Sequence, residues 1–182
     1  MPLPRSVDLC GACVRRPPPF DQLQAALHYA PPVSHLVQRF KFGGDLAAGR
    51  LLAELLADAL IARQVRRPQL MIPVPLNWRR WWRRGFNQAE WLSRDLGRHL
   101  GGLPQARALR RHRATAAQSS LPARRRRGNV RGAFVLAGLP PGTRHVALID
   151  DVATTGATLA ECARVLKRAG VAQVDAWVVA RA

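Results

Sequence analysis

Short apolar runs recur along the chain and predict a set of buried strands. Leu70–Val74, His145–Ile149 and Val174–Val179 are dense in aliphatic residues and bounded by turn-forming residues, and Ala133–Leu136 is a shorter run of the same kind. Phe20–Tyr29 alternates weakly and fits either an edge strand or a short helix.

The segments that follow the first runs have helical spacing. Val33–Phe40 predicts a short helix after the Pro31-Pro32 break. Asp45 is placed to accept a hydrogen bond from the first turn of a longer helix. The apolar face predicted for that helix consists of Leu52, Leu55, Leu56, Ala59 and Leu60.

Two further helices are predicted downstream. Asn87 with Glu90 three residues later forms a cap-like pair. The inward residues of the helix that it opens are Trp91, Leu92, Leu96 and Leu100. Leu159–Ala169 is the other helix, with Gly170 at its end. Strands that alternate with helices predict an α/β fold with a mainly parallel sheet and helices on both faces.

Composition restricts the class of protein. The 182 residues suit one domain with a core, and 48% hydrophobic residues argue against general disorder. No apolar run reaches the roughly 18 residues that cross a bilayer, and the N-terminus lacks the apolar stretch of a signal peptide. We therefore expect a cytoplasmic protein without a membrane span.

The net charge of +18 is concentrated in the middle of the chain. Residues 63–131 hold 18 Arg against Glu90 and Asp95, a net charge of +16. Only two basic residues in the whole chain are Lys, and nucleotide-composition bias in the source genome is one explanation for the Arg excess. Because such a bias would not obviously spare the two ends, the location of the charge indicates an anionic ligand.

Two stretches carry most of this charge. Residues 77–91 interleave tryptophan with arginine, whereas 110–132 lack a clear period and predict a long mobile loop. Rings that stack on bases beside cations that track phosphates are typical of single-stranded DNA binding. Inward-packed tryptophans with a solvated arginine face are an equally good interpretation. The candidate residues are Trp78, Arg79, Arg80, Trp81, Trp82, Arg83, Arg113, Arg126 and Arg127.

The sharpest chemical pattern is VALIDDVATTGATL at 146–159. Asp150 and Asp151 follow an apolar strand, and a Thr/Gly turn then leads into a helix. A helix start with free N–H groups and a close backbone approach at glycine suits a phosphate. Two carboxylates beside it suit a sugar diol or a phosphate-bound Mg²⁺. The turn consists of Ala153, Thr154, Thr155, Gly156, Ala157 and Thr158.

This stretch resembles the 5-phosphoribosyl-1-pyrophosphate (PRPP) motif of type I phosphoribosyltransferases. The resemblance implies that fold, with the acid pair on the ribose hydroxyls and the turn on the 5-phosphate. Further blocks resemble the ComF family of competence proteins: CGACVRRPPPFD at 10–21, FKFGGD at 40–45, IPVPLNWRRWWRRGFNQAE at 72–90 and RHRATAAQSSL at 111–121. Together they cover almost the whole chain in the family's order.

The family resemblance implies PRPP or a similar phosphorylated ribose as ligand, with Mg²⁺, and a setting in DNA uptake or the use of imported DNA. A DNA-translocating helicase of the uptake machinery is an implied partner. The region around Thr115–Arg126 resembles the loop that closes over the reaction centre. The residues that match the pyrophosphate loop are Pro73, Val74, Pro75, Leu76 and Asn77, with Arg84 nearby.

Whether the chain turns over a substrate is left open by its residues, because no general base or acceptor pocket stands out. If it is an enzyme, the resemblance implies a Mg²⁺-dependent phosphoribosyltransferase. The alternative is a single-stranded DNA-binding component of the uptake machinery without transferase turnover. A third option is an RNA-binding regulator on the same fold.

The cysteines divide the chain into two parts. Residues 1–19 resemble the remnant of a Cys-x-x-Cys zinc-ribbon-like segment, and 20–182 form the phosphoribosyltransferase-like domain. Cys10 and Cys13 supply half of the four ligands that structural zinc needs, so we do not expect zinc in this chain. Either the chain starts at an internal Met or the ribbon was lost. Cys162 lies on the apolar face of the last helix and is expected to be a packed thiol.

Overall fold

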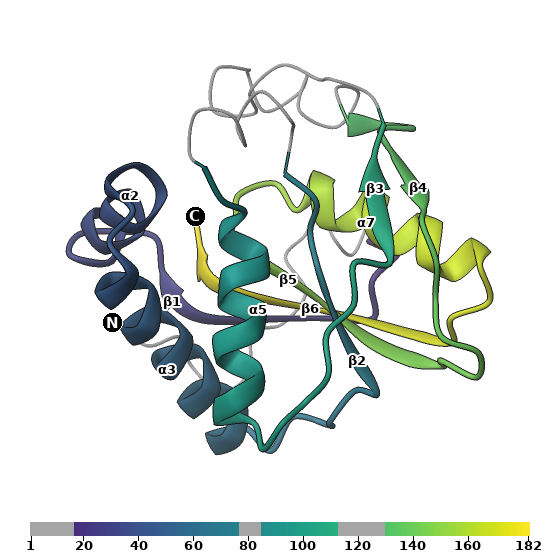
Figure 1. The fold of residues 1–182 in the computed structure, drawn as a ribbon, viewed down its shortest axis with the longest axis horizontal. Helices are drawn as coiled ribbons and strands as arrows, with labels where there is room; N and C mark the ends of the chain where they lie inside the picture. Colours follow the sequence, from purple (N-terminus) through teal and green to yellow (C-terminus); the bar gives the residue numbers. More distant parts are fainter. Residues whose placement is uncertain (1–16, 77–84, 113–129) are drawn as a thin grey trace.

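A computed structural model describes residues 17–76, 85–112 and 130–182 (Figure 1). Within these residues the central sheet has the strand order β1-β6-β5-β2, and all neighbouring strands are parallel. The strands are β1 (Gln22–His28), β2 (Leu70–Pro73), β5 (His145–Ala153) and β6 (Gln173–Arg181). All four amino ends therefore meet at one edge of the sheet, the amino edge, and all four carboxyl ends meet at the other, the carboxyl edge.

Helices cover both faces of this sheet (Figure 1). One face packs against α2 (Val33–Gly43), α3 (Leu46–Ala62) and α5 (Gln88–His99), and the other packs against α7 (Ala157–Arg168). Alternate side chains of β5 enter the two cores: Val146 and Leu148 face α7, while Ala147 and Ile149 face the other three helices. The predicted α/β architecture is confirmed, and it is consistent with a phosphoribosyltransferase-like fold.

Local sequence signals explain how the helices begin and pack. The Ala48 N–H donates to Asp45 Oδ1 at 3.0 Å, which is the predicted cap of α3. Leu52, Leu56 and Leu60 are buried on the apolar face of that helix. A Cβ at Gly49 would lie 2.7 Å from the Phe40 ring, so glycine permits the close approach of α3 to α2.

Some elements differ from the prediction. Phe20–Tyr29, which fitted either an edge strand or a short helix, contains an edge strand, because β1 pairs with β6 alone. A small antiparallel pair, β3 (Leu109–Arg111) with β4 (Phe134–Leu136), lies on the α7 side, so the predicted loop at 110–132 begins inside a strand. Glu90 contacts Arg107 instead of closing a capping box with Asn87. The reason is that a guanidinium offers a carboxylate a stronger, charge-assisted bond than a backbone N–H does.

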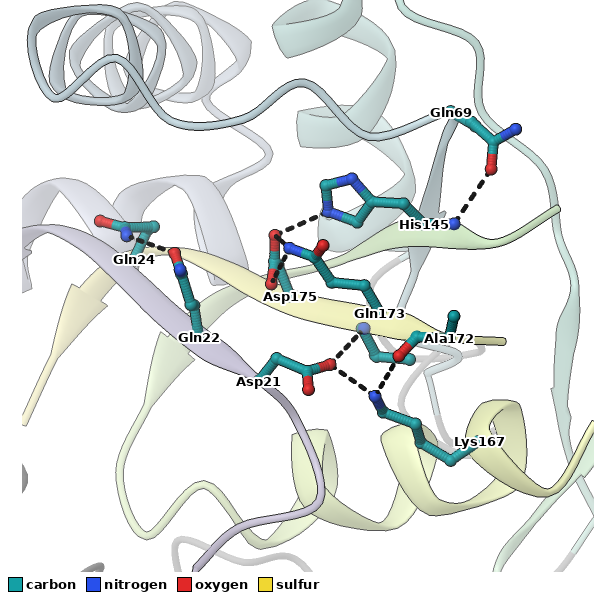
Figure 2. Close-up of polar contacts among 10 residues, drawn as sticks. Asp21, Gln22, Gln24, Gln69, His145, Lys167, Ala172, Gln173 and Asp175 are labelled. Carbon is teal, nitrogen blue, oxygen red and sulfur yellow. Dashed lines mark hydrogen bonds and ion pairs between the residues drawn. The ribbon is translucent and has the colours of Figure 1, made fainter. Parts of the chain in front are cut away.

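The amino edge carries a network of polar side chains that bond to one another and to the backbone (Figure 2). His145 Nε2 donates to Asp175 Oδ2 at 2.8 Å, and Gln173 Nε2 also contacts that carboxylate. Both His145 and Asp175 are buried. Asp21 Oδ2 accepts from the Val174 N–H at 2.7 Å and lies 2.6 Å from Lys167 Nζ. Both carboxylates of this network have two donors, as the burial of Asp175 requires.

Among the described helices, none is both long enough and apolar enough to cross a bilayer.

Candidate functional site

The carboxyl edge brings two of the predicted site segments together. β2 and β5 are neighbours, with Pro73 opposite Ile149, and the Val74 N–H donates to the Ile149 carbonyl at 2.9 Å. The start of the predicted pyrophosphate loop therefore lies directly beside the acid pair at 150–151. In parallel α/β sheets ligands bind outside the carboxyl ends of strands, which makes this edge the candidate site.

The acid pair lies inside β5 and does not follow it. The strand was expected to end at Ile149, but Asp150 still pairs with Val178, and Ala153 pairs with Arg181. The reason is that β6 runs on to Arg181 and supplies backbone partners to the last residues of β5. The two aspartates are consequently held on a paired strand.

The two carboxylates are directed to different faces of the sheet. Lys41 Nζ from α2 lies 2.9 Å from Asp151 Oδ1, so Asp151 faces the side of α2. Asp150 alternates to the α7 side, where its charge acts on the thiol of Cys162. Asp150 Oδ1 also accepts from the Asp151 N–H at 2.8 Å. Each aspartate therefore has its own electrostatic environment.

The pKa of the Cys162 thiol reflects the burial and the charges on the α7 side of the sheet. Burial raises the pKa of this thiol well above its usual range, the negative charge of Asp150 raises it further, and Arg111 opposes the shift. The thiol is fully buried in the core, as predicted. Arg111 also lies over the Phe134 ring, with Cζ 5.3 Å from the centroid. Cys162 is therefore a packed, protonated thiol and not a nucleophile.

The predicted phosphate-binding turn at 153–158 leads from the end of β5 into α7. Gly156 has a φ of +68° at the start of α7, a conformation that favours glycine. No side chain caps the helix, and Thr155 Oγ1 is only a distant partner, 3.4 Å from the Ala157 nitrogen. Thr154 is exposed, and Thr155 and Thr158 are partly exposed. The first N–H groups of α7 and these hydroxyls can therefore donate to a phosphate.

Asn87 ties the predicted pyrophosphate loop to α5. Its side-chain oxygen accepts from the Ala89 N–H at 3.1 Å, and its Nδ2 donates to the Val74 carbonyl at 3.2 Å. Asn87 thus caps the helix and at the same time holds the chain at Val74, while Pro75 and Leu76 are partly exposed beyond it. Sequence reasoning gave Asn87 the capping role alone.

Lys41 is the site residue that sequence reasoning missed. Lys41 lies in the FKFGGD stretch, which was used only for its resemblance to the ComF family. It is one of two lysines among 29 basic residues. The rarity of lysine was the available signal, because a lysine among so many arginines indicates that the position favours lysine.

The remaining candidates lie outside the described residues. They are Asn77, Trp78, Arg79, Arg80, Trp81, Trp82, Arg83, Arg84, Arg113, Arg126 and Arg127, together with Cys10 and Cys13. In the part of the chain that the structure does describe, no three His, Cys, Asp or Glu side chains cluster as metal ligands would. The described site therefore consists of the acid pair, the 153–158 turn, the Pro73–Leu76 segment and Lys41.

Comparison with known proteins gives three informative relatives. The chain is 43% identical over 176 residues to the DNA utilization protein YhgH of Escherichia coli O157:H7, which covers 94% of this chain and 77% of that protein. It is 41% identical over 179 residues to competence protein F of Haemophilus influenzae, with 95% and 78% covered. It is 29% identical over 158 residues to competence protein ComFC of Streptococcus pneumoniae, with 87% and 67% covered. No protein-family model matches the chain.

Proposed function

Starting from the premise that the chain belongs to the ComF family, we propose that it binds PRPP or a similar phosphorylated ribose at the carboxyl edge of its sheet. We further propose that it does so in DNA uptake or the use of imported DNA. The names of the relatives, DNA utilization protein and competence protein, support this setting.

One observation carries the ligand proposal. The acid pair and the start of α7, which belong to one stretch of the sequence, meet the distant Pro73–Leu76 segment at a single edge of the sheet. A phosphorylated sugar with a second phosphate group needs acceptors for its hydroxyls and two separate donor sets for its phosphates. The carboxyl edge offers the carboxylate acceptors and the N–H groups of α7 side by side, and the Pro73–Leu76 segment runs next to them.

The roles of the residues follow from their chemistry. Asp150 and Asp151 accept hydrogen bonds from the ribose hydroxyls, and the N–H groups of α7 with Thr154, Thr155 and Thr158 hold the 5-phosphate. The Pro73–Leu76 segment approaches the diphosphate, with its position fixed by Asn87.

Mg²⁺ fits this site together with the diphosphate. The ion prefers anionic oxygens, which the diphosphate supplies, and the partly exposed Asp150 is the carboxylate that would face it. When bound, Mg²⁺ neutralises the charge of the diphosphate. The chain's own residues orient the sugar and its phosphates.

Calorimetric titration with PRPP and Mg²⁺ tests the ligand. The double variant Asp150→Asn with Asp151→Asn should lose binding, because neutral amides cannot replace two anionic acceptors at the diol. Glu54→Gln with Asp58→Asn is the matched control, since it removes the same charge from exposed positions of α3. Absence of binding by the unmodified protein would refute the proposal.

Single-stranded DNA binding is the second candidate function. It is favoured by the described arginines of the basic middle third, of which Arg66, Arg67, Arg94, Arg98, Arg107 and Arg110 are exposed. Such binding should weaken steeply with salt because each neutralised phosphate releases counterions. Replacing Arg79, Arg80, Arg83 and Arg84 by Ala should flatten this dependence, and an unchanged slope would exclude that stretch.

Measuring DNA binding with and without PRPP separates the two ligands. Competition would indicate one shared site. Independent binding would assign DNA to the basic middle third and PRPP to the carboxyl edge.

A further inference from the structure

Lys41 introduces a positive charge into the candidate site. It lies in the last turn of α2, and its ammonium is 2.9 Å from Asp151 Oδ1. The two side chains are 18% and 11% exposed, so bulk water and salt screen the contact less than they screen a surface ion pair.

The ion pair leaves Asp151 with one available oxygen. Lys41 contacts Oδ1, and among the described residues no donor contacts Oδ2. A carboxylate oxygen accepts hydrogen bonds readily, so Oδ2 can receive a hydroxyl proton without displacing the lysine. Asp151 can therefore accept a hydrogen bond from an uncharged donor such as a hydroxyl group.

The carboxylate of Asp151 is a poor ligand for a free divalent cation. Such an ion needs uncompensated negative charge, and Lys41 already balances the charge of Asp151. The ion would also approach a fixed ammonium of like sign. The charge of Asp150 acts on Cys162 of α7, whereas the carboxylate of Asp151 is paired with Lys41 of α2.

We propose that Lys41 determines the ligand specificity of Asp151, so that this carboxylate accepts neutral sugar hydroxyls and does not bind a free divalent cation. The identity of the sugar rests on the proposed function, whereas the exclusion of the cation does not. Lys41 acts through Asp151 and is a positioning residue.

Lys167 supplies a matched control within the same chain. It is the other lysine, and its Nζ lies 2.6 Å from Asp21 Oδ2 at the amino edge. If the ion pair of Lys41 were purely structural, removal of either lysine should have the same effect on ligand binding. A role in ligand specificity belongs to Lys41 alone.

The experiment uses the full chain and two probes, Mn²⁺ alone followed by electron paramagnetic resonance, and metal-free ribose 5-phosphate followed by calorimetry. We expect Lys41→Met to bind Mn²⁺ at least tenfold more tightly than the unmodified protein and ribose 5-phosphate at least tenfold more weakly. Lys41→Arg keeps the positive charge, so its affinities for Mn²⁺ and ribose 5-phosphate should match those of the unmodified protein. Lys167→Met should leave both unchanged.

Two further variants keep the test decisive. Adding Asp151→Asn to Lys41→Met should abolish the gained Mn²⁺ binding, which assigns that ion to Asp151. Lys41→Gln retains a hydrogen-bond donor to Asp151 while removing the charge, so it should show the same gain if Lys41→Met does not fold.

The inference is overturned if the neutral variants of Lys41 bind Mn²⁺ no more tightly than the unmodified protein, or if Lys167→Met gains as much. Failure of the unmodified protein to bind PRPP would overturn the proposed function instead. The Mn²⁺ measurement would still decide the role of Lys41, because it needs no sugar ligand.

Discussion

Both edges of the sheet carry a lysine–aspartate ion pair, but the surroundings of the two pairs differ. At the amino edge Asp21 accepts from Lys167 and from the Val174 N–H, and Lys167 also donates to the Ala172 carbonyl (Figure 2). At the carboxyl edge Asp151 has Lys41 as its partner and keeps Oδ2 available among the described residues.

The difference between the two edges distinguishes polar groups that stabilise the fold from polar groups that can bind a ligand. Bonding capacity that is used up within the fold contributes to stability, whereas capacity that is left over can serve a ligand. By this criterion we expect the amino edge to be structural and the carboxyl edge to hold the proposed ligand site. Substitutions at the two edges should therefore affect different measurements.

The largest effect on stability is expected from Asp175→Ala at the amino edge. The change leaves the buried His145 and Gln173 without their shared acceptor, which should lower the free energy of unfolding by about 2 to 4 kcal/mol. Urea denaturation followed by circular dichroism measures this loss. PRPP affinity, measured on the folded fraction, should stay unchanged, and a parallel loss of affinity would contradict the division between the edges.

A smaller but more discriminating effect is expected from the two glycines that flank α7. Gly156 has a φ of +68° at the carboxyl edge and Gly170 a φ of +91° at the amino edge. Alanine at either position should cost about 1 to 2 kcal/mol, because both conformations are strained for a residue with a Cβ. Only Gly156→Ala should also weaken PRPP binding, by roughly tenfold, since the Cβ alters the turn that meets the phosphate. Equal binding by both variants would argue against the phosphate turn.

The smallest effect is a pH dependence at the amino edge. Burial raises the pKa of Asp21, but the hydrogen bonds from Lys167 and the Val174 N–H lower it more, so the folded-state pKa lies below its ordinary value. A depressed pKa stabilises the fold above the unfolded-state pKa of about 4, and this contribution is lost as the pH falls through the folded-state value. Because Asp21 is 42% exposed, the contribution should be roughly 0.5 kcal/mol or less.

Thermal unfolding of the unmodified protein and of Asp21→Asn between pH 6 and pH 3 tests this dependence. The difference in melting temperature should be present at pH 6 and shrink below pH 4. A difference that grew on acidification would mean that the sign of the shift is wrong.

Much of the fold could be predicted because its signals are local. The caps at Asp45 and Asn87, the apolar spacing of α3 and the dense apolar runs of β2, β5 and β6 are all encoded within a few residues of each element. β4 lies within the predicted strand Ala133–Leu136, but β3 and its antiparallel pairing with β4 escaped prediction, because a strand of three residues gains its stability from a partner more than 20 positions away.

The candidate site was predicted in part for the same reason. The acid pair and the Thr/Gly turn lie in one continuous stretch, so their chemistry could be read directly. The pairing of Asp150 and Asp151 within β5 depends on how far β6 extends beside it, and the contact of Lys41 with Asp151 depends on how α2 packs. Both are tertiary facts that periodicity does not encode.

The strand order has a consequence for how the chain is made. Of the strands that the structure describes, β6 is synthesised last, yet it lies between β1 and β5 in the sheet. β1, which emerges first, pairs with nothing else in the sheet and must wait for residues 173–181 to leave the ribosome. The central sheet can therefore be completed only after residues 173–181 have emerged, and loss of β6 would leave β1 without a partner strand among the described residues.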